Sequence, residues 1–294
     1  MDDQQFLAEQ FEQHRTHLRA VAYRMLGSIT EAEDAVQEAW LRLSRSDADA
    51  IENLAGWLTT VVSRVCLNVL RSRTARREDL LDPHLPDPIV TVEGTLDPEE
   101  EVMLADAVGV ALLVVLETLT PAERLAFVLH DTFAVPFDQV AEVLGRSPEA
   151  TRQLASRARR RVRGATAPPD ADVARQRAVV DAFFAAARAG DFEGLMALLD
   201  PDVVARSDGG PRRAQLSLVT SGAAAVAGQA LTYANPAADV HPALVNGAAG
   251  VVVTLGGHPQ AIMGFTVVDG RIVAINALVD PDRIAELDLA AFTG

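Results

Sequence analysis

The sequence lacks the patterns that define several large classes of protein. Its 294 residues contain a single cysteine, Cys66, which excludes an internal disulfide and a zinc site built from clustered cysteines. No apolar run approaches the roughly 20 residues that a membrane-crossing helix needs. Residues 1–20 are polar and charged, unlike a secretory signal peptide. We therefore expect a cytoplasmic protein with no membrane partner, no metal and no cofactor.

Lysine is also absent, so all 26 basic residues are arginine, a bias that we attribute to a GC-rich gene. The placement of the charges is more informative than their sum of −15. Residues 78–106 contain ten acids and no arginine, whereas residues 146–163 contain seven arginines and one acid. A solvated helix face in an acidic protein would normally mix the two signs. The segregation predicts parts of the chain that bind different partners.

Helical spacing of apolar residues predicts three or four helices over residues 4–74. Gly27 marks the end of the first helix, and Thr30 with Glu33 predicts a capping box at the start of the second. A further helix is expected over residues 54–77. Each of these two helices has a polar face opposite an apolar one. The polar face of the second helix comprises Glu33, Asp34, Gln37 and Glu38, and that of the helix over residues 54–77 comprises Arg64, Asn68 and Arg71.

Residues 78–102 contain four prolines among their acids and predict an extended linker. The stretch 103–163 is again helical, with Thr120 capping a helix that has Pro121 in its first turn. Further along, Gly145 supplies a left-handed turn residue and Ser147 a cap, between a short apolar helix and a basic one. This order predicts a helix-turn-helix whose arginines face DNA. A merely solvated basic helix is the alternative, and it leaves the turn chemistry unexplained.

The remaining chain has a different pattern. Residues 168–172 break the helix, and a long helix follows that ends at Gly190. Strand-like runs then lie within residues 248–257, 260–268 and 271–279, the last two joined by Asp269-Gly270, which is a strong hairpin signal. We expect a long helix packed on a curved antiparallel sheet.

The order of these parts resembles the extracytoplasmic-function sigma factors of bacterial RNA polymerase. Residues 31–43 are similar to the core-binding helix of that family's region two, residues 57–73 to its promoter-melting helix, and residues 119–162 to its region four. The final part resembles the cone-shaped SnoaL-like fold, which the SigJ-like group of these factors carries at the C-terminus. The resemblance implies a multidomain protein with two all-α sigma domains, the second with a helix-turn-helix, followed by an α+β cone-shaped SnoaL/NTF2-like domain. The boundaries that we assign are 1–77 for region two, 78–102 for the linker, 103–165 for region four and 172–294 for the SnoaL-like domain.

The resemblance implies a sigma factor that binds core RNA polymerase at its β′ clamp and β flap, directs it to promoter DNA and needs no separate anti-sigma factor. Polymerase contacts are implied in the acidic helix. Melting a promoter requires a pocket for an unstacked base and positive charge along the strand, so we expect Asn68 to read a base and nearby arginines to meet phosphates. The residues concerned are Asp34, Gln37, Glu38 and either Trp40 or Leu43 for polymerase, and Arg64, Asn68, Arg71 and Arg73 for the melted strand.

In the recognition helix, side chains of the N-terminal half reach base edges and later ones follow the backbone. Arginine pairs with guanine in two hydrogen bonds, and glutamine pairs with adenine. The later arginines surround the helix too fully to share one groove, so some of them must be phosphate contacts or internal ion pairs. The residues implied in DNA binding are Arg152, Gln153, Ser156, Arg157 and Arg160.

Three short signatures of the SigJ-like group have counterparts at residues 84–88 (HLPDP), 208–212 (DGGPR) and 280–283 (DPDR), with charge kept in each. The acidic linker and the arginines near the later two signatures carry opposite charge. We therefore expect the linker to dock on the C-terminal domain and fix the spacing of the two DNA-binding domains. The residues assigned to this interdomain regulation are Asp87, Asp208, Arg212, Asp282 and Arg283.

A different class of function stays open, namely a one-component DNA-binding regulator with a ligand-sensing or enzymatic C-terminal domain. The two region-two helices argue against it, because an ordinary repressor uses neither a polymerase-binding helix nor a melting helix. The fold itself does not license an activity. The candidate catalytic residues show no diagnostic spacing, so we expect no enzyme; they are Asp208, Tyr233, His241, His258 and Asn276.

Overall fold

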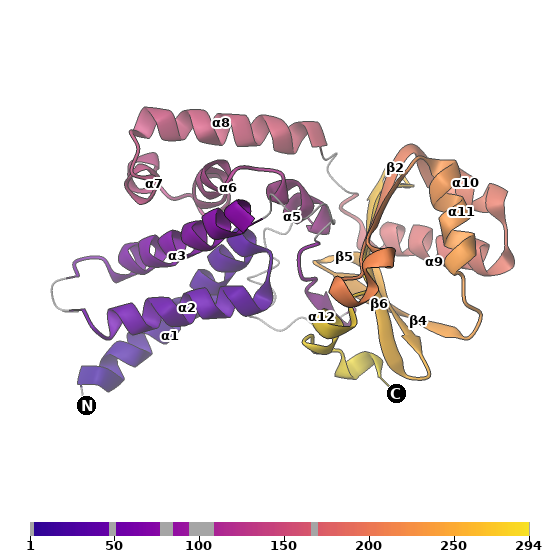
Figure 1. The fold of residues 1–294 in the computed structure, drawn as a ribbon, viewed down its shortest axis with the longest axis horizontal. Coiled ribbons are helices and arrows are strands. Elements are labelled where there is room, and N and C mark those ends of the chain that lie inside the picture. The colour runs from indigo at the N-terminus through magenta and orange to yellow at the C-terminus, as the bar shows by residue number, and fades with distance from the viewer. Residues whose placement is uncertain (1–2, 47–50, 77–84, 94–108, 166–169, 294) are drawn as a thin grey trace. The chain divides into compact units, whose positions relative to one another are not determined.

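The computed structural model describes residues 3–46, 51–76, 85–93, 109–165 and 170–293, which Figure 1 shows as ribbons. The chain divides into two compact units. The described residues of the first unit are 3–46, 51–76 and 113–165, and those of the second are 85–93, 109–112 and 170–293. The boundary therefore falls within the helix of residues 109–117, most of which lies in the first unit. Among the described residues, no helix has the length and apolar character that a bilayer crossing requires.

The first unit begins with three helices: α1 (Asp3–Leu26), α2 (Ile29–Leu43) and α3 (Leu54–Arg76). Gly27 adopts a φ of 69°, which ends α1 as predicted. The predicted capping box at Thr30 is wrong, because the extended residue Ser28 already caps α2 by accepting a hydrogen bond from the backbone nitrogen of Glu31. Ending α1 at Gly27 places Ser28 at the cap and Thr30 inside the first turn.

The same unit continues with α5 (Gly109–Glu117), α6 (Pro121–Phe127), the π-helical turn η3 (Val128–Thr132), α7 (Phe137–Leu144) and α8 (Pro148–Ala165). Thr120 caps α6 in a complete capping box with Glu123. Gly145 is left-handed with a φ of 64°, and the Ser147 hydroxyl accepts a 3.2 Å hydrogen bond from the backbone nitrogen of Ala150. The predicted helix-turn-helix is therefore confirmed as α7 and α8. Residues 103–108 of the predicted helix lie outside the described residues.

Arg124 of α6 joins the two halves of this unit. Its side chain is only 2% exposed and donates a 2.7 Å hydrogen bond from Nη1 to Glu117 Oε1. Two further nitrogens donate to the backbone oxygen of Arg24 at 3.2 Å, at the end of α1. Burial lowers the pKa of this guanidinium, and the Glu117 carboxylate opposes that shift. The interaction ties α6 to the first helix of the chain.

The second unit is a seven-stranded sheet covered by helices. Its helical elements are α9 (Val173–Ala189), α10 (Phe192–Leu198), η4 (Pro211–Leu216), α11 (Ala223–Tyr233), α12 (Pro281–Ala285) and η5 (Ala290–Phe292). Its strands are β1 (Val90–Thr91), β2 (Leu199–Asp208), β3 (Leu218–Ser221), β4 (Ala238–Val245), β5 (Ala248–Leu255), β6 (His258–Val268) and β7 (Arg271–Leu278), arranged in the order β1-β4-β5-β6-β7-β2-β3.

The predicted hairpin between β6 and β7 is confirmed, since Asp269 and Gly270 take φ values of 51° and 75° as a type I′ turn requires. The predicted antiparallel pairing is confirmed for β5, β6 and β7, but the sheet as a whole is mixed, because β2 pairs with β7 in parallel. The long connection between these two strands runs through β3, α11 and the β4–β6 meander, and a connection of that length permits parallel pairing.

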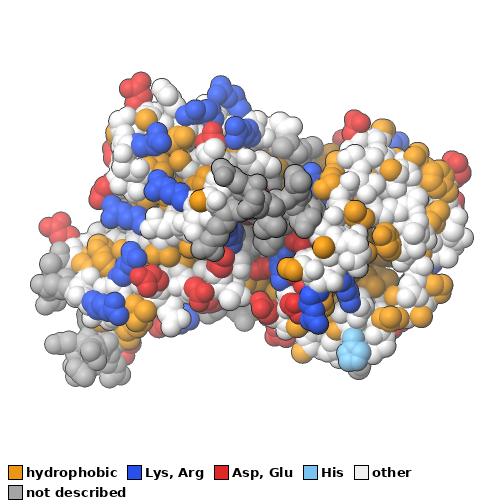
Figure 2. All heavy atoms as spheres, in the orientation of Figure 1, with side chains coloured by type: hydrophobic (Ala, Val, Ile, Leu, Met, Phe, Trp, Pro, Cys, Tyr) orange, Lys and Arg blue, Asp and Glu red, His pale blue; other side chains and the backbone are white. Residues whose placement is uncertain are grey.

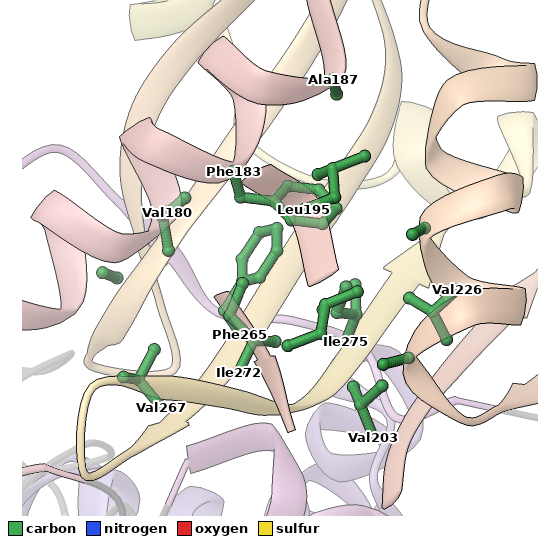
Figure 3. Close-up of a cluster of buried hydrophobic side chains, with 14 of the residues drawn as sticks. Val180, Phe183, Ala187, Leu195, Val203, Val226, Phe265, Val267, Ile272 and Ile275 are labelled. Atoms are coloured by element: carbon green, nitrogen blue, oxygen red, sulfur yellow. The ribbon is translucent and has the colours of Figure 1, made fainter. Parts of the chain in front are cut away.

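Two apolar clusters lie on opposite faces of this sheet. On one face, Phe183 of α9, Phe265 of β6 and Ile275 of β7 point toward one another, and Val226 of α11 closes the cluster (Figure 3). The rings of Phe183 and Phe265 are 5.7 Å apart. The other face packs against the C-terminal segment and the linker, through residues that include Val252, Ile262, Leu278, Phe292 and Val90. Alternate residues of β4, β5 and β6 thus serve the two clusters.

Candidate nucleic-acid and polymerase surfaces

The recognition helix α8 presents one continuous exposed polar face. Its buried side is made by Leu154, Ala155 and Ala158, which pack within the unit. Basic side chains gather over the edge of the first unit where α8 lies (Figure 2). The exposed residues recur at spacings of three and four and so share one face; they are Arg152, Gln153, Ser156, Arg157 and Arg160.

Two of the later arginines are engaged inside the unit. Arg159 Nε lies 2.5 Å from Asp131 Oδ1 on η3, and Arg161 Nη1 donates a 3.0 Å hydrogen bond to Glu123 Oε2 on α6. Glu123 is thereby both the capping-box residue of α6 and the anchor of α8. The expectation that some arginines form internal pairs is confirmed for these two. They orient α8. Arg157 of the outer face also lies 3.9 Å from Glu123 Oε1 through its Nε, although about half of its side chain is exposed.

The predicted face of the melting helix is also exposed. Arg64, Asn68 and Arg71 follow one another at spacings of four and three along α3, so they lie in one line on its surface. Arg73 does not join them. Its Nη1 donates a 2.8 Å hydrogen bond to the backbone oxygen of Leu26, and its Nη2 pairs with Glu31. We therefore correct the prediction for Arg73, which links α3 to the α1–α2 turn rather than presenting an open cation.

On α2, Asp34 and Gln37 are exposed, while Glu38 pairs with Arg42 at 2.8 Å. The prediction of Leu43 as a polymerase contact is wrong, because its side chain is completely buried in the helical core. Leu41 of the same helix is 38% exposed.

A groove of about 480 Å³ adjoins this face between α1 and α2. Gln37 and Trp40 line it from α2, and Phe11 and Arg15 line it from α1. The ring centroids of Phe11 and Trp40 are 5.2 Å apart, so the floor of the groove is aromatic. The groove could accept apolar side chains of a partner beside the polar contacts.

The linker signature is held in the second unit by Arg283. Its Nε donates a 2.9 Å hydrogen bond to Asp87 Oδ1, its Nη1 donates a 2.7 Å hydrogen bond to Asp208 Oδ2, and its Nη2 donates a 2.6 Å hydrogen bond to the backbone oxygen of Leu85. The backbone nitrogen of Leu85 donates back to Asp208 at 2.8 Å. These side chains are largely buried, with Asp208 5% exposed. The predicted contact between Asp87 and Arg283 is confirmed, and it belongs to a buried network.

Backbone pairing extends this docking. Ile89 donates its N–H to Asn246 Oδ1 at 3.1 Å and accepts the N–H of Asn246 at 2.8 Å. Val90 and Thr91 then form β1 against the edge of β4. Arg212 and Asp282, the other two residues assigned to this regulation, lie 2.6 Å apart but are exposed on both sides, so solvent screens the pair.

The candidate catalytic residues are not brought together. Asp208 belongs to the linker network, His241 is 2.9 Å from Thr254 Oγ1, and His258 is exposed at the start of β6. Asn276 lies buried on the linker side of β7, whereas Tyr233 is exposed at the end of α11. Within the described residues there is also no group of histidine, cysteine or acidic side chains suited to a metal ion.

Comparisons with known proteins agree with this arrangement. Residues 10–76 match the model of Sigma-70 region 2, and residues 109–162 match that of Sigma-70, region 4. The chain is 42% identical over 291 residues to the ECF RNA polymerase sigma factor SigJ of Mycobacterium tuberculosis, covering 93% of this chain and 92% of that protein. It is 36% identical over 278 residues to the probable ECF RNA polymerase sigma factor SigI of the same species, covering 93% of each.

A crystal structure of the Mycobacterium tuberculosis extracytoplasmic function sigma factor SigJ superposes with a TM-score of 0.76 at 38% identity, covering 96% of this chain and 99% of that one. Two sigma-70 regions followed by an α+β domain define a transcription initiation factor rather than an enzyme. The chain belongs to the extracytoplasmic-function RNA polymerase sigma factors, and it is a SigJ-like member with a C-terminal SnoaL-like domain.

Proposed function

We propose that three separate surfaces of the first unit each perform one function in transcription initiation. The outer face of α2, with Asp34, Gln37 and Glu38, binds the β′ clamp of core polymerase, and region four meets the β flap. The face of α3 holds the melted strand. The face of α8 reads the upstream promoter element. The observation that carries this assignment is that each helix keeps a line of polar side chains exposed while its other side is buried.

The charges of these faces match their partners. Arg64 and Arg71 flank Asn68 on α3, so a base at Asn68 would have positive charge on both sides for the neighbouring phosphates. The α8 face combines Arg152 and Gln153, whose side chains suit guanine and adenine edges. The α2 face carries acids instead, which repel DNA and suit a basic protein surface.

We further propose that the second unit regulates the first through the docked linker, so that the chain needs no separate anti-sigma factor. The linker connects the two DNA-binding domains, and its segment 85–93 is fixed by Arg283 and by β1 pairing. The test is run-off transcription with core polymerase and the variant Asp87→Arg, which places two arginines together at this network. We expect Asp87→Arg to alter the amount of transcript while its circular dichroism spectrum stays unchanged. The double variant that combines Asp87→Arg with Arg283→Asp should restore transcription only in part, because Asp208 would then face the new carboxylate at position 283.

Binding to core polymerase tests the assignment of α2. The double variant Asp34→Arg with Gln37→Arg should lower co-purification with core polymerase at least tenfold, because it reverses the charge of the face. The exposed residue Arg45 lies just beyond the end of α2, and Arg45→Gln provides the control. Undiminished co-purification of the double variant would remove this face from the interface.

A further inference from the structure

The second unit contains a cavity of about 410 Å³ between α9, α11 and the inner face of the sheet. Packing voids in protein cores rarely exceed a water molecule, whereas ligand pockets span roughly 300–1,000 Å³. Phe183 and Ile275 of the apolar cluster form part of its wall (Figure 3). Tyr233 and Leu255, which are 57% and 42% exposed, also line it and form an accessible rim. The cavity therefore has the size and the access of a small-molecule site.

The wall is largely apolar, and all of the charged residues that line it are arginines. Its lining residues include three arginines and no aspartate, glutamate or histidine. Alternation along β2 directs Ala205 and Ser207 to the cavity and the Arg206 side chain to the opposite face. Arg213 of η4 and Arg188 of α9 are thus the cations of the wall. A wall without carboxylate or imidazole groups lacks the usual acid–base residues, so it suits binding rather than catalysis.

Arg213 is positioned for an anion. It is half-buried, and its guanidinium donates to two neutral oxygens, Val279 O and Gln260 Oε1, each at 3.3 Å. Both distances exceed the usual range of 2.7–3.2 Å for such bonds. Among the described residues no carboxylate pairs with it. A guanidinium has five N–H donors in a planar fork that matches a carboxylate, so donors remain for a ligand.

A second polar group in the wall lacks a partner. The side-chain oxygen Oε1 of Gln229 on α11 is buried and accepts no hydrogen bond within the described parts of the chain. An unsatisfied buried acceptor destabilises the fold, and a hydroxyl group on a bound molecule would satisfy it. Val226, Ala230 and Tyr233 lie on the same side of α11 and also line the cavity. The Gln229 acceptor and the half-buried Arg213 therefore face an apolar space, while Arg188 is exposed.

We propose that this cavity binds a small, largely apolar carboxylic acid that also carries a hydroxyl group. Its carboxylate pairs with Arg213, its hydroxyl donates to Gln229 Oε1, and its ring or chain packs against apolar residues such as Phe184, Val253 and Met263. Arg213 is half-buried whereas Arg188 is exposed, so one guanidinium fork is placed for the ligand. That fork and the apolar wall favour a monoanionic carboxylate over a phosphate, which needs more donors.

Isothermal titration calorimetry of the full chain tests the proposal with three matched probes and needs no polymerase. The probe 6-hydroxy-2-naphthoate offers both polar groups, 2-naphthoate offers only the carboxylate, and 2-naphthol lacks the carboxylate. We expect the hydroxy acid to bind most tightly and 2-naphthol to bind at least tenfold more weakly than 2-naphthoate. Absence of binding by both acids, or equal affinity for 2-naphthol, would overturn the proposal.

Two variants assign the contacts. Arg213→Gln should weaken both acids at least tenfold and leave 2-naphthol unchanged, because only the acids use the cation. Arg271→Gln is the control, since Arg271 is exposed on β7 away from the cavity. Gln229→Leu should remove the advantage of 6-hydroxy-2-naphthoate over 2-naphthoate. Thermal melts of all variants report folding, and a folded Arg213→Gln that keeps full affinity for the acids contradicts the assignment.

Discussion

Arg283 Nη1 donates a 2.7 Å hydrogen bond to Asp208 Oδ2, joining the second and third short signatures of the chain inside the second unit. The same Asp208 oxygen accepts the backbone N–H of Leu85, so the linker is bound to the carboxylate that Arg283 neutralises. Gly210 is required beside this network, because a Cβ on it would lie 1.9 Å from Asp280 Oδ2, whose carboxylate caps α12. The linker, the β2 end and α12 therefore form one buried polar cluster.

This cluster predicts unequal costs for two arginines of the same domain. Arg283→Ala leaves Asp208 and Asp87 buried together without a cation, so we expect the free energy of unfolding to fall by about 3–5 kcal/mol. Arg212→Ala breaks only the exposed pair with Asp282 and should cost less than about 1 kcal/mol. Urea unfolding of both variants measures the difference. Equal losses would mean that Arg283 does not act through burial.

Sequence reasoning identified the partners at Asp87 and Arg283 but not the strength of their interaction. Charge complementarity suggested a surface pair, whereas Asp208 and the backbone of Leu85 complete a buried network. The burial of this pair depends on which faces of β2 and α12 pack together, and a local sequence pattern does not predict such long-range packing. The short strand β1 was missed for the same reason, since Val90 and Thr91 become a strand only by pairing with β4.

The helical faces were easier to predict, because periodicity alone separates buried from exposed positions. Asn68 and the reading candidates on α8 are exposed as the spacing required. The two errors have different causes. Leu43 follows Ala39 at a spacing of four on the buried face of α2, and its assignment to polymerase came from the resemblance rather than from this pattern. Arg73 reaches back to Glu31, which is 42 residues earlier in the chain, and a helical wheel does not show that contact.

Promoter reading by α8 predicts different effects for arginines on its two sides. Arg152→Ala and Arg157→Ala should each weaken binding to the upstream promoter element by roughly 1–3 kcal/mol if they contact bases. Arg159→Ala is the matched control, because Arg159 is paired with Asp131 inside the unit. The measurement is holoenzyme affinity for the mapped promoter at fixed salt concentration. Wild-type affinity in both reading variants would exclude them from the site.

Promoter melting by α3 predicts a defect that depends on the template. Asn68→Ala should leave polymerase association intact and slow open-complex formation on duplex DNA, because the unstacked base loses its hydrogen-bonding partner. A pre-melted template should restore the rate, since unpairing is already complete. Ser72→Ala, at an exposed position of the same helix, serves as the control. Failure of the pre-melted template to rescue Asn68→Ala would place its role elsewhere.

The one cysteine predicts a clear difference between folded and unfolded chains. Burial raises the pKa of the Cys66 thiol from its ordinary value of 9.0 to about 12, so the folded chain keeps it protonated at pH 8. Because the folded pKa is raised, stability from this group is present below pH 9 and falls as the pH rises toward 12.

A disulfide reagent that detects thiolates should therefore react with Cys66 at pH 8 at least a hundredfold more slowly in buffer than in denaturing urea. The control is Ser72→Cys in a Cys66→Ala chain, whose exposed thiol should react at once in both conditions. Rapid modification of Cys66 in buffer would show that the α3 core opens far more readily than its complete burial implies.

Run-off transcription with purified core polymerase tests the central claim most directly. Core polymerase alone should give no specific product from the promoter, and addition of this chain should produce transcripts with a single start site. Asn68→Ala and the α2 double variant should each lower that product at the step assigned to its surface. A chain that binds the promoter DNA yet neither associates with core polymerase nor yields a specific transcript would contradict the account.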